Sequence, residues 1–434
     1  MRVNKNLINF FFGAAILLPA IFLTASCSKQ SAASATSSSN PETAFSNNEQ
    51  VTAAQEMISK SPDAPLGYTM LALSYIKLAR ESGDFSLNSK AETAVNHALE
   101  LEPEDATARK LQASLLLTFH RFPEALAAAT KLHQQYPQDS FICGALTDAN
   151  VELGNYDEAV KNVQRMVDLK PNMESYSRVS HVRSLYGDTD GAIEAMGTAA
   201  KSADPADKEA RAWCRVFLGN EYFKAGKYAD AELAYDLALK IFPEYHLGLA
   251  AKGQARMAVG DYEHAIKFLT QSQDRVPLTE TVILLGDLYK KTGNADKAQQ
   301  QYQLAEFIEQ KLGNIDMRRL ALLWADQDTK LDEALAIAEK EHATRKDIFT
   351  ADIYAWCLYK KGNFPEAKNI INEAMSLKTK DARIFYHAGM IEKGLGNRSE
   401  AIRLIESALK LNPAFDVIQS ENAKQALQLL QQKS

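Results

Sequence analysis

The chain has 434 residues, of which 46% are hydrophobic and 24% charged, and its formal net charge is −6. A chain of this length is too long for a domain with one ordinary hydrophobic core, so it could form two or three domains. It could also form a single repeat array, because a solenoid grows without enlarging a central core. A mildly acidic chain without basic clusters argues against nucleic acid as the partner.

The first 26 residues predict a targeting signal rather than folded structure. Arg2 and Lys5 form a short positive segment, and an apolar run follows over residues 7–23. This run is interrupted by Pro19 and is marginal for spanning a hydrocarbon core of about 30 Å. We therefore expect residues 1–26 to be a signal peptide.

The signal ends in the sequence Leu-Thr-Ala-Ser directly before Cys27. This ending resembles a bacterial lipobox, although the leucine lies one place earlier than usual. The resemblance implies a lipid on Cys27 and a chain anchored in the bacterial cell envelope, at the outer membrane because Ser28 rather than aspartate follows the cysteine. Residues 27–48 are rich in serine and predict a flexible tether. An uncleaved anchor or ordinary secretion is the alternative.

Small residues then recur with a period close to 34. They are Ala91, Ala125, Ala159, Ala192, Ala231, Ala265, Ala298, Ala334, Ala367 and Ala401. A glycine lies five residues before seven of them, and a proline lies twelve residues after six. Glycine suits a left-handed residue after a first helix, alanine allows a second helix to approach closely, and proline ends that second helix. The spacing predicts about ten stacked helix pairs.

The pattern resembles the tetratricopeptide repeat, whose signature has leucine–glycine, tyrosine, alanine, aromatic and proline places over 34 residues. The fifth repeat carries Leu218, Gly219, Tyr222, Gly226, Ala231, Tyr235, Ala238 and Pro243. The resemblance implies an all-α, right-handed superhelical solenoid of about ten helix-turn-helix repeats. We expect the array over residues 49–413, including an N-terminal half-repeat, and a polar capping helix over residues 414–434.

The remaining residues predict no catalytic chemistry. Metal-binding, nucleophile and phosphate-loop motifs are absent from the sequence. Cys143, Cys214 and Cys357 fall on first helices of repeats that are too far apart for a disulfide, so we expect buried thiols. The sequence therefore predicts no enzyme, no metal and no cofactor.

The concave surface is the predicted binding surface. In this repeat class the ninth place of each unit points into the groove. Repeats three to seven have polar residues there, namely Asp148, His181, Asn220, Gln254 and Asp287. Repeats eight to ten have Leu323, Trp356 and Met390. This change predicts that an extended peptide is bound by hydrogen bonds at one end and by an apolar anchor at the other. The alternative is a solvated face without a binding role.

The place that normally holds a buried tyrosine is unusual in four repeats. It holds Asn150, Arg183, Arg256 and Glu392. Buried unpaired charge is costly, so we expect these side chains to be paired, to reach solvent or to face a ligand. Arg178 and Arg183 are predicted to form a polar network with Asp148 and Asp287.

The sequence thus indicates a lipid-anchored scaffold or adaptor of the bacterial envelope that binds other proteins or peptides. A small-molecule or glycan-binding lipoprotein that uses the polar groove is the alternative. A clamp for C-terminal carboxylates, which some members of the family carry, is not expected because no three consecutive repeats have its lysine, asparagine and arginine set.

Overall fold

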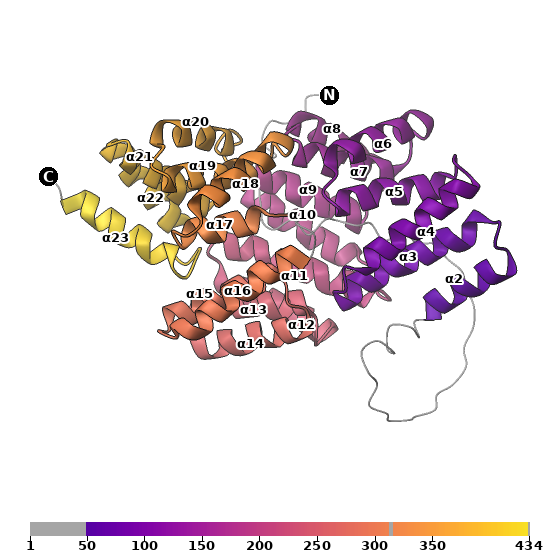
Figure 1. The fold of residues 1–434 in the computed structure, drawn as a ribbon, viewed down its shortest axis with the longest axis horizontal. Coiled ribbons are helices and arrows are strands. Elements are labelled where there is room, and N and C mark those ends of the chain that lie inside the picture. The colour runs from indigo at the N-terminus through magenta and orange to yellow at the C-terminus, as the bar shows by residue number, and fades with distance from the viewer. Residues whose placement is uncertain (1–48, 312–315, 433–434) are drawn as a thin grey trace. The chain divides into compact units, whose positions relative to one another are not determined.

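The computed structural model describes residues 49–311 and 316–432, and over these ranges the chain forms helices and no strands (Figure 1). The predicted signal peptide, the lipid site at Cys27 and the tether lie outside the described residues. The described part divides into two compact units, whose boundary lies between Ala145 and Leu146. We call them the N-terminal and the C-terminal unit.

The N-terminal unit begins with a single helix and continues with helix pairs. Its helices are α2 (Glu49–Lys60), α3 (Pro65–Ser82), α4 (Leu87–Leu101), α5 (Ala106–Thr118) and α6 (Phe122–Gln135), and α7 (Ser140–Glu152) crosses the boundary. Successive helices pack on one another, and α3 also contacts α5.

The C-terminal unit continues the same alternation of first and second helices. Its helices are α8 (Tyr156–Leu169), α9 (Met173–Leu185), α10 (Thr189–Ser202), α11 (Lys208–Lys224), α12 (Tyr228–Ile241), α13 (His246–Ala258), α14 (Tyr262–Arg275), α15 (Thr279–Lys291), α16 (Ala295–Lys311), α17 (Arg318–Asp326), α18 (Leu331–Thr344), α19 (Ile348–Lys360), α20 (Phe364–Ala374), α21 (Ala382–Gly394), α22 (Arg398–Leu411) and α23 (Gln419–Gln432). The described chain is therefore the all-helical solenoid that the sequence predicts.

The small residues of the pattern lie where paired helices touch. All ten of the recurring alanines are buried, with at most 3% of their surface exposed. The seven glycines of the pattern have φ between 71° and 81°, the left-handed conformation that the sequence predicts. Two repeats without this glycine place other residues in that conformation, namely His120 in repeat two and Asp328 and Lys330 in repeat eight.

The expectation for the cysteines is also met. Cys143, Cys214 and Cys357 are buried thiols. The second helix of repeat seven, α16, has 17 residues and is the longest of the second helices described. Among the described helices, none is both long and apolar enough to cross a membrane.

Candidate functional site

Within the C-terminal unit, the turns of repeats three to five contact the linkers that follow repeats eight to ten. Three hydrogen bonds make these contacts: Ile348 N to Tyr156 Oη (2.9 Å), Thr379 Oγ1 to Leu185 O (2.8 Å) and Asn412 Nδ2 to Phe223 O (3.0 Å). Each bond joins one repeat to the segment that follows the second helix of the repeat five units later in the chain. We call these contacts the seam, because they join segments of the array that are far apart in sequence.

Two of the left-handed glycines let the backbones approach closely at the seam. A Cβ atom on Gly154 would lie 2.7 Å from the carbonyl oxygen of Lys346, and one on Gly226 would lie 3.1 Å from that of Leu411. The equivalent Gly293 has no neighbouring atom within 4 Å of such a Cβ. At the seam, glycine therefore serves both the turn and the contact between repeats.

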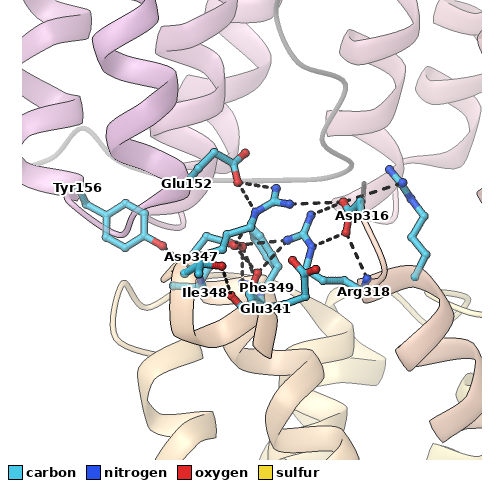
Figure 2. A network of polar contacts seen from close by, with 12 residues as sticks. Glu152, Tyr156, Asp316, Arg318, Glu341, Asp347, Ile348 and Phe349 are labelled. Carbon is cyan, nitrogen blue, oxygen red and sulfur yellow. Dashed lines mark hydrogen bonds and ion pairs between the residues drawn. The ribbon is translucent and has the colours of Figure 1, made fainter. Parts of the chain in front are cut away.

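A buried network of charged residues lies at the first of these contacts (Figure 2). Arg318 binds Asp316 with two hydrogen bonds of 2.8 and 2.7 Å, and it also donates to Thr350 (2.9 Å). Arg345 donates through Nε to Glu152 (2.6 Å) and through Nη1 to Asp316 (3.4 Å). The bond to Glu152 crosses the seam, because Glu152 ends α7 and Arg345 follows α18.

The electrostatics of this network follow from its burial. The side chains of Asp316 and Arg345 are only 4% and 3% exposed. Burial alone would raise the pKa of Asp316, but Arg318 and its neighbouring guanidinium groups hold this pKa well below the usual range. Burial raises the pKa of Glu152 although Arg345 opposes the shift. Asp316 is therefore the firmly ionised centre of the network.

The eight residues predicted to line the groove are held mainly by contacts within the protein. Asp148 accepts two hydrogen bonds from Arg178 (2.9 and 2.7 Å), Asn220 accepts one from Tyr235 (2.9 Å) and Asp287 accepts one from Tyr302 (2.7 Å). His181, Gln254 and Met390 are half-buried, as are the first three. Over the described residues, no hydrogen bond or ion pair joins any two of the eight.

Leu323 and Trp356 differ from the expectation of an accessible apolar anchor. Trp356 is 1% exposed and Leu323 is 4% exposed. The indole nitrogen of Trp356 donates to Asp326 (2.8 Å), and its ring stacks on His387 of the next first helix, with ring centroids 4.1 Å apart. The neighbouring helix therefore covers the tryptophan, so in this conformation it supports the fold rather than offering a binding surface.

The environment of His181 keeps its side chain uncharged. Burial, together with the positive charges of Lys224 and Arg178, lowers the pKa of His181 from 6.5 to about 4. The side chain is therefore a neutral imidazole at neutral pH. It offers a hydrogen-bonding group to this surface but no charge.

The polar residues at the tyrosine places are paired, either within their own repeat or with the second helix of the preceding repeat. Asn150 donates to the carbonyl of Leu146 (2.8 Å), and Arg183 donates to that of Gly191 (3.1 Å). Arg256 pairs with Glu232, and Glu392 pairs with Lys368. Of the predicted network, the Arg178–Asp148 pair forms, whereas Arg183 pairs with Asp188 and Asp287 with Tyr302.

Sequence reasoning missed the seam and its charged network. The missing prolines are a poor signal for it. Repeats eight and nine have Lys346 and Thr379 in place of the proline, and both lie at the seam. Repeats four and seven also lack this proline, however, and the seam linker of repeat ten keeps Pro413.

Comparisons with known proteins identify the repeat. Two family models described as tetratricopeptide repeat match the chain, one at residues 76–140 and 218–278 and the other at residues 279–306 and 382–415. Together with the stacked helix pairs, these matches show that the chain contains tetratricopeptide repeats within a helical solenoid. Among curated proteins, none matches it significantly.

Several solved structures are similar to the chain at low sequence identity. A tetratricopeptide repeat protein from Parabacteroides merdae ATCC 43184 has 18% identity and a TM-score of 0.36, over 64% of this chain and 99% of its own. PilW, a widely conserved type IV pilus biogenesis factor, has 16% identity and a TM-score of 0.39, over 46% and 92%. Yeast Tom70 has 15% identity and a TM-score of 0.39, over 90% and 94%. At these values the likeness carries no argument about partners.

The seam predicts different effects for two equivalent glycines. Gly293→Ala should cost about 1–2 kcal/mol of unfolding free energy, because alanine is strained at positive φ. Gly154→Ala should cost more, because its Cβ would also press on the Lys346 carbonyl. Urea unfolding of both variants measures the difference. Equal costs would mean that the turn of repeat three does not contact the linker after repeat eight.

The charged network predicts a large effect for Arg345. Arg345→Met should destabilise the protein by about 3–5 kcal/mol, because it removes a guanidinium group from buried carboxylates. Arg403→Met is the control, since its pair with Glu400 is largely exposed, and it should cost at most about 1 kcal/mol. Urea unfolding measures both.

A double-mutant cycle tests whether the interaction crosses the seam. Arg345→Met combined with Glu152→Gln should cost less than the sum of the two single changes, because each change alone leaves a buried partner without its counterpart. Additive costs would show that Arg345 and Glu152 do not interact in solution.

Proposed function

We propose that the chain is a lipid-anchored tetratricopeptide-repeat scaffold of the bacterial cell envelope, which binds other proteins. The observation that carries this proposal is the order of its parts. A leader with an apolar run and a lipobox-like ending precedes Cys27, a serine-rich segment follows, and repeats occupy the remainder. A lipid on Cys27 with a tether of this kind would hold the repeats at a membrane surface, within reach of membrane-bound partners.

Binding of proteins is the role that a repeat surface supports best. Stacked repeats present an extended surface that is suited to peptides and folded partners. Among the predicted groove residues, we retain the half-buried Asp148, His181, Asn220, Gln254, Asp287 and Met390 as candidates for partner contacts. Leu323 and Trp356 are not among these candidates, because both side chains are buried and pack beneath the surface.

The alternative of a small molecule or glycan in this groove has less support. The polar groove residues already bind neighbouring side chains, as the pairs Asp148–Arg178 and Asp287–Tyr302 show. A small polar ligand would have to replace these bonds with equally good ones, since a buried polar group without a partner costs about 1–3 kcal/mol. A protein partner can instead bind around these pairs without breaking them.

Substitution of the cysteine tests the anchor. Cys27→Ala should abolish incorporation of labelled fatty acid and release the protein from the membrane fraction, because it removes the only atom proposed to carry the lipid. Cys214→Ala is the matched control, since that thiol is buried in α11, and it should keep the label. Unchanged labelling of Cys27→Ala would sink the anchor.

Photo-cross-linking in intact cells tests the binding of partners. A cross-linking amino acid at Gln254 should give discrete products with another protein, and these should weaken in the Cys27→Ala chain, which no longer stays at the membrane. The same amino acid at the exposed Gln299 of α16 serves as the control for random collisions. The scaffold role is wrong if the two positions give the same background pattern.

A further inference from the structure

The end of the C-terminal unit lies against first helices that belong to several earlier repeats. Residues 412–418 link α22 to α23, and we call residues 412–432, which include α23, the strap. Val417 of the strap packs against the apolar cluster of repeats six and seven that contains Met257 and Leu288, on the first helices α13 and α15. A linker that follows repeat ten therefore reaches back to the cluster of repeats six and seven.

Hydrogen bonds and a ring contact hold the strap on two further first helices. Gln419 donates its side-chain amide to Asp326 of α17 (2.7 Å) and accepts a hydrogen bond from Tyr386 of α21 (3.1 Å). Phe415 lies against the ring of Tyr386, with ring centroids 5.7 Å apart. Gln419 is only 5% exposed. The strap therefore covers part of the surface that the first helices present, with an amide and an aromatic ring as its anchors.

The charge of the strap suits this surface poorly. Asp416, whose side chain is 11% exposed, pairs with Arg383 at 3.6 Å. Burial and the charge of Asp416 raise the pKa of Asp287 well above its usual range, and they also raise the pKa of Asp326. The nearby cations Lys290 and Arg383 reduce these shifts without cancelling them. The surface therefore disfavours a further carboxylate and would be stabilised by a cation in the place of Asp416.

The helix of the strap is held by few apolar contacts. Its buried residues are Gln419, Ser420, Ala423 and Ala426, and Leu427 and Leu430 are only partly buried. The preceding first helix, α21, buries Ile384, Tyr386 and Ile391. As the last helix of the array, α23 packs mainly on α22. A terminal helix with so little buried apolar surface can open at a lower free-energy cost than the rest of the array.

We propose that the strap is an autoinhibitory segment, which covers part of the inner face of repeats six to ten and gives way to a partner segment that carries lysine or arginine where the strap carries Asp416. The proposal rests on the protein-binding role proposed above and names the surface and its occupant. Such a partner segment must replace the two hydrogen bonds of Gln419. In addition it gains attraction to the carboxylates of the surface, whereas the strap is repelled by them.

Two synthetic peptides test the chemistry of the occupant with the full-length protein in detergent. One has the sequence of residues 412–421, and the other has lysine in the place of Asp416. Fluorescence anisotropy should show that the lysine peptide binds at least about tenfold more tightly, because it exchanges repulsion for attraction at Asp287 and Asp326. Equal binding of the two peptides would overturn the basic partner.

Loosening the strap tests whether it covers the binding surface. The double change Val417→Ser and Gln419→Ala should raise the affinity for the lysine peptide about tenfold, because it increases the fraction of molecules with an uncovered surface. Leu429→Ser is the matched control, since this side chain of α23 is 55% exposed, and it should bind like the wild type.

Hydrogen exchange of the unaltered chain tests the displacement directly and does not depend on the folding of a variant. Saturating lysine peptide should speed the exchange of the α23 amides and leave that of α3–α6 unchanged. Unchanged exchange of α23 on peptide binding would overturn autoinhibition, as would a double variant that stays folded and gains no affinity. If autoinhibition fails while cross-links from Gln254 persist, the scaffold role stands without it; if both fail, the scaffold role fails as well.

Discussion

Close contact between paired helices is the constraint on which the remaining structure depends. Each second helix lies against its first helix through an alanine, and all ten of these alanines are buried. A larger side chain at such a place would force the helices apart at a cost of about 1–3 kcal/mol. Neighbouring repeats stack through the same helices. The distance between the two helices of a repeat therefore also limits how the next repeat packs, and the same alanine-mediated contact recurs along the array.

The seam arises because small rotations between repeats accumulate along the stack. After five repeats the linkers return to the turns of earlier repeats, as the Tyr156–Ile348 and Phe223–Asn412 bonds show. The stacked repeats of the C-terminal unit therefore gain contacts that a solenoid with only nearest-neighbour contacts lacks. The buried network around Asp316 belongs to this second kind of contact, and it favours one register because Arg345 must meet Glu152.

The sequence predicts the conformation and burial of residues that recur in every repeat. It predicts fewer of the contacts that only one repeat makes. Glycine at 154 and alanine at 231 could be assigned their conformation and burial because many repeats share them. The contact of Thr379 with Leu185 could not, because its residues are far apart in the chain and belong to no common motif. The repeat pattern likewise gives the inner-face place of Trp356 but not its covering, because His387 of the next helix stacks over it.

These differences bear on where partners can bind. In the C-terminal unit, polar residues of the inner face already pair with neighbouring side chains, as Asp148 does with Arg178 and Asn220 with Tyr235. A partner that displaced these bonds would have to replace them with equally good ones, because a buried polar group without a partner costs about 1–3 kcal/mol. Polar residues that pair internally, such as Arg345 with Glu152, therefore stabilise the fold rather than bind a partner.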